Sequence, residues 1–159
     1  MSNKTKIEDI TAELTRRGWK VAVAETTGVL SLSCVSLPWS SSWFLEGRLA
    51  YSHEAKTRLG CRPEVMIAHG TVSTEGVREM ARAIRETTGA DIGLAESSIV
   101  GPGGGTPDKP VGTYFVSLVS ADVVLSLNGR VIGTREQVQQ KVAEAAWGLL
   151  RIYLNQDGG

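Results

Sequence analysis

A serine, a tyrosine and a lysine with potential for chemistry lie within one segment of this sequence. Ser41 lies ten residues before Tyr51, and Lys56 lies five residues after it. A serine hydroxyl is a weak nucleophile until a base takes its proton, and a lysine kept neutral by burial or nearby positive charge can be that base. Ser–Lys pairs are recognised variants of the Ser–His–Asp triad. The segment therefore allows hydrolytic chemistry, although a solvated helical lysine is the commoner meaning of such a spacing.

The segment Gly101–Pro110 combines four glycines with three prolines and is predicted to be a loop. Glycine leaves backbone N–H groups unobstructed and proline stiffens the path, so the loop suits a phosphate or carboxylate. A plain long connector is the alternative. The P-loop pattern is absent because Lys109 is out of register, and the Rossmann pattern is absent because Val111 begins a β-rich run. We expect a ligand loop whose ligand type is unspecified.

Thr26 and Thr27 follow a short buried strand and precede an apolar stretch that is predicted to be a helix. Threonine side chains cap helices, and the first N–H groups of a helix attract anions. We expect the two threonines to cap this helix and to aim its N–H groups at whatever the glycine loop holds.

The elements that must position these residues alternate between helical and strand patterns. This alternation predicts an α/β fold with helices on both faces of the sheet. A predicted hairpin formed by the last two strands makes the sheet mixed. Strands are expected at 20–24, 43–51, 90–95, 112–120 and 122–128, and helices at 5–18, 29–37, 52–60, 63–68, 73–88 and 135–155.

Length and composition exclude several classes of protein. The 159 residues suit one domain, 1–159, with a full core. Lys plus Arg equals Asp plus Glu at 17 each, which favours neither nucleic acid nor an acidic membrane surface as a partner. Apolar runs are too short to span a membrane. Two cysteines and two histidines without metal-ligand spacing predict reduced thiols, no metal site and a cytoplasmic protein.

Six motifs in order carry a resemblance to a known family. The sequence resembles the C-terminal domain of the competence/damage-inducible protein CinA, whose stand-alone form is nicotinamide-nucleotide amidase (NMN deamidase). The combination of the GPGGGTPxKPVG loop with Tyr-x-x-x-x-Lys is highly specific to that family. The family motifs AES-C-TGG, GSSAWF, YSNEAK, HGAVSEE, GIAGPGGGTPEKPVG and GDR correspond to residues 24–28, 39–44, 51–56, 69–73, 101–112 and 133–135.

The resemblance implies a three-layer α/β/α sandwich with a mixed sheet. It implies hydrolysis of the carboxamide of nicotinamide mononucleotide to nicotinate mononucleotide and ammonia, without metal or organic cofactor. The partner is then a small-molecule nucleotide, not nucleic acid or a membrane, and a homo-oligomer is compatible with this. By position, Lys56 is the base, with a pKa depressed by burial and nearby cationic charge. Tyr51 is a proton relay, and Ser41 matches a family site serine. The residues expected to hold the phosphate or the oxyanion are Thr27, Gly28, Gly101, Gly103, Gly104, Gly105, Thr106 and Arg135.

The sequence departs from the family where a nucleophile could lie. The serine of AES is Thr26 here, itself a candidate nucleophile, and Val29 replaces the second glycine of TGG. Before the loop, TG is replaced by Ser97-Ser98. Threonine can attack, but its methyl group restricts its approach. Two classes therefore stay open: a Ser(Thr)/Lys amidase whose nucleophile is Ser41 or Thr26, and a weakly active or inactive nucleotide-binding module.

Overall fold

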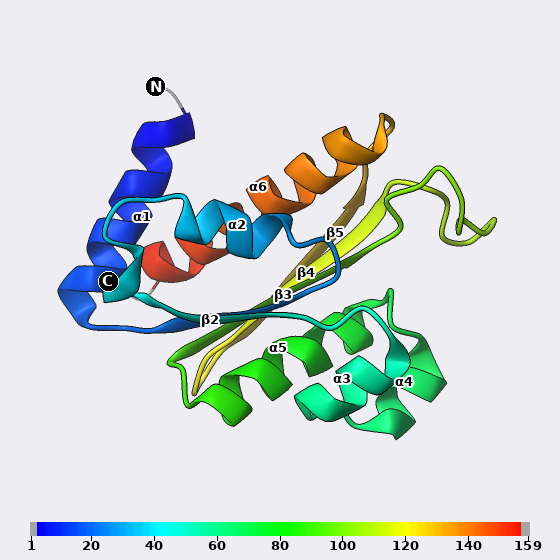
Figure 1. Ribbon diagram of the computed structural model, residues 1–159, viewed down its shortest axis with the longest axis horizontal. Coiled ribbons are helices and arrows are strands. Elements are labelled where there is room, and N and C mark those ends of the chain that lie inside the picture. The colour runs from blue at the N-terminus through cyan, green and yellow to red at the C-terminus, as the bar shows by residue number, and fades with distance from the viewer. Residues whose placement is uncertain (1–2, 157–159) are drawn as a thin grey trace.

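A computed structural model describes residues 3–156 of the protein as a five-stranded sheet between two helical layers (Figure 1). The spatial order of the strands is β2-β1-β3-β4-β5. The strands are β1 (Val21–Glu25), β2 (Phe44–Leu49), β3 (Ile92–Ser98), β4 (Thr113–Val119) and β5 (Val124–Arg130). The helices are α1 (Asn3–Arg17), α2 (Val29–Val35), the single 3-10 turn η1 (Ser40–Ser42), α3 (His53–Leu59), α4 (Pro63–His69), α5 (Thr74–Thr88) and α6 (Arg135–Gln156).

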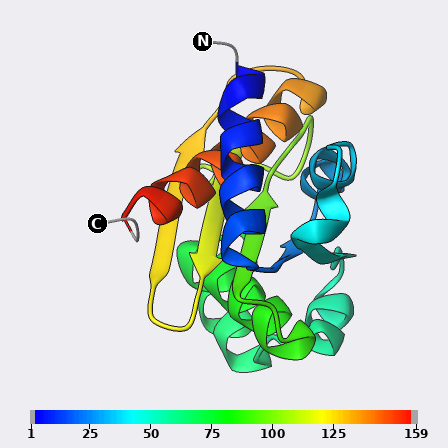
Figure 2. The ribbon, with the colours of Figure 1, turned by 90° about the vertical axis from the view of Figure 1, so that its left-hand side faces the viewer.

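Two cores hold the layers together. Helices α1, α2 and α6 cover one face of the sheet, and α3, α4 and α5 cover the other, as Figures 1 and 2 both show. Helix α5 presents Val77, Met80 and Ile84 to the second core, and all three are fully buried. Burying each such side chain contributes roughly 1.5–3 kcal/mol. The predicted three-layer α/β/α sandwich is confirmed.

The predicted elements are confirmed within a few residues, with one informative difference. The third strand was expected to end at residue 95, but β3 continues through Glu96, Ser97 and Ser98. The extension follows from antiparallel pairing with β4, which places Glu96 opposite Val116 and Ser98 opposite Tyr114. Three polar residues beyond the predicted strand end are therefore part of the sheet.

Strands β1, β2 and β3 are parallel, while β4 and β5 form the antiparallel hairpin that makes the sheet mixed. The carboxyl ends of the parallel strands meet at one edge of the sheet, where chains of this class bind ligands. Since β2 and β3 lie on either side of β1, the helices that follow β1 and β2 leave on opposite faces. The edge beside the end of β1 is therefore the natural place for a site.

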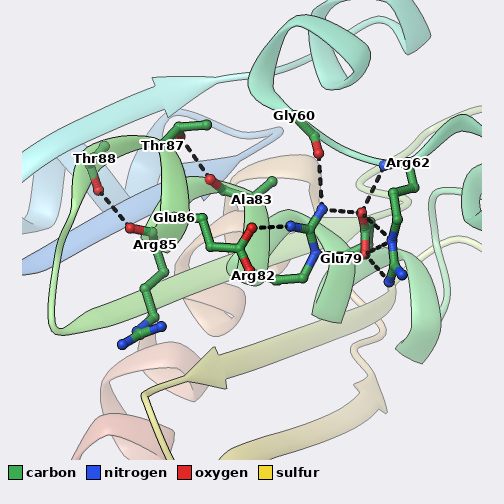
Figure 3. Close-up of polar contacts among 9 residues, drawn as sticks. All are labelled: Gly60, Arg62, Glu79, Arg82, Ala83, Arg85, Glu86, Thr87 and Thr88. Carbon is green, nitrogen blue, oxygen red and sulfur yellow. Dashed lines mark hydrogen bonds and ion pairs between the residues drawn. The ribbon is translucent and has the colours of Figure 1, made fainter.

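An ion-pair network fixes the short helices α3 and α4 against α5 (Figure 3). The buried carboxylate of Glu79 accepts the backbone N–H and the guanidinium of Arg62 and also the guanidinium of Arg82. Arg82 in turn donates to the carbonyl of Gly60 at 2.9 Å. Burial alone raises the pKa of Glu79, but the bonds from Arg82 and Arg62 outweigh it and lower that pKa to about 2. This network clamps the C-terminal end of α3, the helix that carries Lys56.

Candidate functional site

A small pocket of about 130 Å³ opens at the carboxyl edge of the parallel strands. Its walls come from the residues after β1, from the start of α3, from the segment before α5 and from the end of β3. The lining residues are Thr26, Thr27, Tyr51, Lys56, Thr71, Val72, Ser97, Ser98 and Val100. The fold thus brings three predicted catalytic residues, Thr26, Tyr51 and Lys56, to one place.

Lys56 is a buried lysine on a short capped helix. Ser52 caps α3 by accepting the N–H of Ala55, and this places Lys56 one turn into the helix with only 3% of its surface exposed. Its Nζ donates to the carbonyl of Ala50 at 2.8 Å and to that of Tyr51 at 3.0 Å. The reading of this residue as a solvated helical lysine is therefore excluded.

The pKa of Lys56 is lowered, as predicted, but for one of the two expected causes only. Burial lowers the pKa because the ammonium loses its hydration. The prediction that a nearby cation also lowers this pKa is wrong. The charges that act on Lys56 are those of Cys61 and Glu96, which raise its pKa and offset part of the burial effect. Lys56 thus faces acidic neighbours.

A fully buried carboxylate lies behind the threonine wall of the pocket. Glu96 accepts the N–H of Thr26 at 2.5 Å and the N–H of Thr27 at 2.9 Å. The hydroxyls of Thr26, Thr27 and Ser98 also donate to it, each at 3.2 Å. Burial raises the pKa of Glu96, the N–H of Thr26 lowers it, and the charge of Glu25 raises it further; the net shift is upward. Three of the lining hydroxyls are therefore anchored on one oxygen pair.

The prediction that Thr26 and Thr27 cap α2 and aim its N–H groups at a ligand is wrong. The N-cap is Gly28, which has a left-handed conformation with φ +79° and no capping side chain. The free N–H groups of the first turn are taken by a second buried carboxylate: Glu25 accepts from Leu30 at 2.8 Å and from Ser31 at 2.9 Å. Thr27 and Gly28 consequently offer no free N–H pair of this kind to an anion.

The structure does not bring Ser41 into this pocket. Ser41 lies in η1, immediately before β2, whereas Tyr51 and Lys56 follow the end of that strand. The six residues of β2 rise about 3.3 Å each, so the strand holds Ser41 roughly 20 Å from the other two residues. Sequence spacing suggested a trio, but an extended strand separates its members. Thr26 is the candidate nucleophile that the fold places beside Lys56.

The glycine loop extends from the sheet between β3 and β4 (Figure 1). Residues 102–108 are exposed, and within residues 3–156 the N–H groups of Gly103, Gly104 and Gly105 form no hydrogen bond. Arg135, predicted to contact the phosphate, instead binds the carbonyl of Gly101 through Nη1 at 2.6 Å and so anchors the base of the loop. The open N–H groups keep this loop a candidate for anion binding.

Several site residues escaped the sequence analysis. Lys109 extends back from the loop, and its Nζ lies 3.8 Å from the position that a Cβ on Gly70 would occupy. Thr71 and Val72 reach the pocket from the turn before α5. Glu96 gave a usable signal, since an ionisable residue inside an otherwise apolar strand is rarely buried without a role. Lys109 and the Thr71–Val72 turn gave none, because their proximity to the pocket depends on chain packing.

Two features of other classes of protein are absent from the described part of the chain. No cluster of three or more His, Cys, Asp or Glu residues suited to a metal ion occurs in it. None of its helices has the length and apolar character that crossing a membrane requires.

Comparison with known proteins places these features in a family. Residues 3–154 match the family model of the CinA C-terminal domain. A CinA-like protein of Thermotoga maritima is 38% identical over 156 residues, covering 96% of this chain and 38% of that protein. A CinA-like protein of Chlorobaculum tepidum is 40% identical over 164 residues, covering 98% of this chain and 39% of that protein. The chain thus spans about two fifths of the length of these relatives.

Solved structures agree with this match. A CinA superfamily protein from Klebsiella pneumoniae superposes with a TM-score of 0.90 at 28% identity, covering 98% of this chain and 99% of that one. A competence/damage inducible protein from Agrobacterium tumefaciens gives a TM-score of 0.89 at 27% identity, covering 96% and 94% of the two chains. From the family model, the relatives and the fold together, this chain belongs to the CinA C-terminal domain family.

Proposed function

We propose that this protein is an amidohydrolase that converts nicotinamide mononucleotide to nicotinate mononucleotide and ammonia. One observation carries the proposal: Lys56 is buried, with a lowered pKa, in a pocket that it shares with Thr26 and Tyr51. A lysine with a lowered pKa exchanges its proton more readily near neutral pH than an ordinary lysine does.

Lys56 is prepared for proton exchange in either protonation state. Its two hydrogen bonds to the carbonyls of Ala50 and Tyr51 leave the ammonium one further proton to donate. The neutral amine, with both protons used on those carbonyls, keeps its lone pair as an acceptor. Lys56 can therefore give a proton to a leaving amine and take one from water. Thr26 is the proposed nucleophile.

The pocket and the glycine loop suit different parts of the nucleotide. About 130 Å³ is less than whole-ligand sites, which run roughly 300–1,000 Å³, so the pocket suits the carboxamide and part of its ring. The phosphate is assigned to the open N–H groups of Gly103, Gly104 and Gly105, with Lys109 as the cation. Water is the only co-substrate that this reaction needs. We propose a cytoplasmic location for the protein.

The deciding experiment measures ammonia release from nicotinamide mononucleotide by the purified protein. Release that is lost in Lys56→Met supports the proposal. Absence of release from folded wild-type protein removes the assigned substrate.

A second candidate is a nucleotide-binding module with little or no catalysis. It is favoured by the capture of the Thr26 and Thr27 N–H groups by Glu96, which removes them as oxyanion donors. The departure at Val29 in the same turn points the same way. Binding of nicotinate mononucleotide without ammonia release would select this candidate.

A further inference from the structure

We infer that Glu96 is the base that takes the proton of the Thr26 hydroxyl, so that this chain activates its nucleophile with a buried carboxylate. The assignment deepens the proposed function and rests on it for the identity of the substrate. It starts from two hydroxyls that meet at one carboxylate: both Thr26 and Ser98 donate to Glu96.

The geometry directs the Thr26 proton toward Glu96. An ionised carboxylate can only accept, so the hydroxyl must be the donor in the contacts of 3.2 Å to Oε1 and 3.4 Å to Oε2. The N–H groups of Thr26 and Thr27 hold Oε1 in place from the backbone. With its proton turned inward, the oxygen of Thr26 presents its lone pairs to the pocket that it lines.

The neighbouring groups are less suited to this step. Lys56 Nζ is held by two carbonyls, and no hydroxyl bond to it occurs among residues 3–156. The Thr27 hydroxyl also contacts Glu96, but it accepts the N–H of Val29 at 3.4 Å as well. Thr26 therefore contributes the hydroxyl that contacts both carboxylate oxygens, and this hydroxyl forms no other hydrogen bond within residues 3–156.

The proposed step balances without an added reactant. The Thr26 Oγ–carbon bond forms as its proton passes to Glu96, and the C–N bond breaks as nitrogen leaves as ammonia with a proton from the Lys56 ammonium. Water then attacks the ester and gives a proton to the Lys56 amine. The departing Thr26 oxygen recovers its proton from Glu96, which restores both groups.

The test uses a reaction that does not depend on the natural substrate. A small alkyl fluorophosphonate should form an Oγ–P bond at Thr26 with loss of fluoride, measured by intact mass and peptide mapping. The charged groups acting on Glu96 are Glu25 from β1 and Lys56 from α3. The labelling rate should rise with pH as Glu96 ionises, and Thr26→Val should abolish it.

Matched variants separate a base from a structural residue. Glu96→Gln keeps an oxygen for the two N–H groups but cannot take a proton, and it should label about 100-fold more slowly without the rise with pH. Glu25→Gln removes a charge that raises the pKa of Glu96, so it should keep the rise with pH and move its midpoint downward. Lys56→Met should still label Thr26 at a rate that rises with pH, because the proposed acceptor of the Thr26 proton is Glu96. Ser98→Ala, which removes a donor from Oε2, should move the midpoint of the rise upward even if Glu96→Gln does not fold.

Other results would overturn the inference. The inference fails if Glu96→Gln labels at the wild-type rate with the wild-type pH profile. It also fails if the midpoint does not move in Ser98→Ala, or if labelling is lost in Lys56→Met. Labelling of Thr27, or no labelling of folded wild type, would overturn it as well. Labelling of Thr26 without ammonia release from nicotinamide mononucleotide would retain Glu96 as the base and reject only the proposed substrate.

Discussion

The β1–α2 turn and the glycine loop both follow strands near one pocket, yet they use their backbone N–H groups in opposite ways. In the turn, the N–H groups of Thr26 and Thr27 point into the protein at Glu96. In the loop, the N–H groups of residues 103–105 are unbonded within the part of the chain that the structure describes, and the segment is exposed. A turn that precedes a helix looks suited to anions, but a buried carboxylate beneath it takes its donors.

This difference gives the turn and the loop separate roles in the proposed site. The turn is anchored by the buried carboxylates of Glu25 and Glu96, which repel an anion. It therefore suits the positioning of hydroxyls. The loop keeps its donors and includes Lys109, so it suits recognition of a phosphate.

The largest expected effect follows from Lys56→Met, which removes the proton-transfer group and leaves turn and loop intact. Ammonia release should fall about a thousandfold in kcat/KM, which corresponds to about 4 kcal/mol of lost transition-state stabilisation. The matched control Lys141→Met removes an exposed lysine on α6 and should keep the wild-type rate. If Lys56→Met is about as active as wild type, Lys56 is not the proton-transfer group and the pocket is not the site of the reaction.

Glu96→Leu should lower the free energy of unfolding more than any substitution in the loop does. It leaves the N–H groups of Thr26 and Thr27 buried without an acceptor, and each such loss costs about 1–3 kcal/mol. We expect the free energy of unfolding in urea to fall by about 3 kcal/mol or more. Glu96→Gln, which keeps an acceptor, should lose about 1 kcal/mol. Equal losses in the two variants would show that the backbone bonds do not hold the turn.

The raised pKa of Glu96 predicts that stability falls as the pH rises. A carboxyl whose folded pKa lies above its ordinary 4.5 favours the folded state when protonated, so its contribution is complete below pH 4.5 and is lost as the pH rises through the folded pKa. The slope should approach at most about 1.4 kcal/mol per pH unit. Glu79 acts on the acid side instead, because its lowered pKa removes stability only as the pH falls from 4.5 toward about 2. Urea unfolding of Glu96→Gln across this range should lack the slope above pH 4.5.

A smaller effect is expected from Gly104→Leu in the loop. Gly104 has φ +89°, which a leucine adopts only with strain, and a side chain there would distort the open N–H groups. Titration calorimetry with nicotinate mononucleotide should show affinity about tenfold weaker, or about 1.4 kcal/mol. Gly148→Ala, on α6 and with open space around its Cβ position, should leave affinity unchanged while adding about 0.5–1 kcal/mol of stability. Unchanged affinity in Gly104→Leu would remove the loop from the site.

Much of the fold was predictable from local sequence signals. The expected helices 52–60 and 73–88 correspond to α3 and α5, whose caps are Ser52 with Gly60 and Ser73 with Gly89. Such signals succeed because the relevant contacts lie within a few residues along the chain. The layer architecture was predictable because helical and strand patterns alternate along the sequence. The family was predictable because six motifs occur in the family's order.

The sequence by itself determined the architecture, the family, and the pairing of Tyr51 with Lys56, because both follow one strand end. Only the tertiary structure decided that Thr26 reaches that pocket and Ser41 does not, since parallel strands align their carboxyl ends and β2 separates its own two ends. It also decided that Glu96 takes the donors of the turn. That bond joins residues 70 positions apart through the pairing of β1 with β3, and no local pattern encodes it.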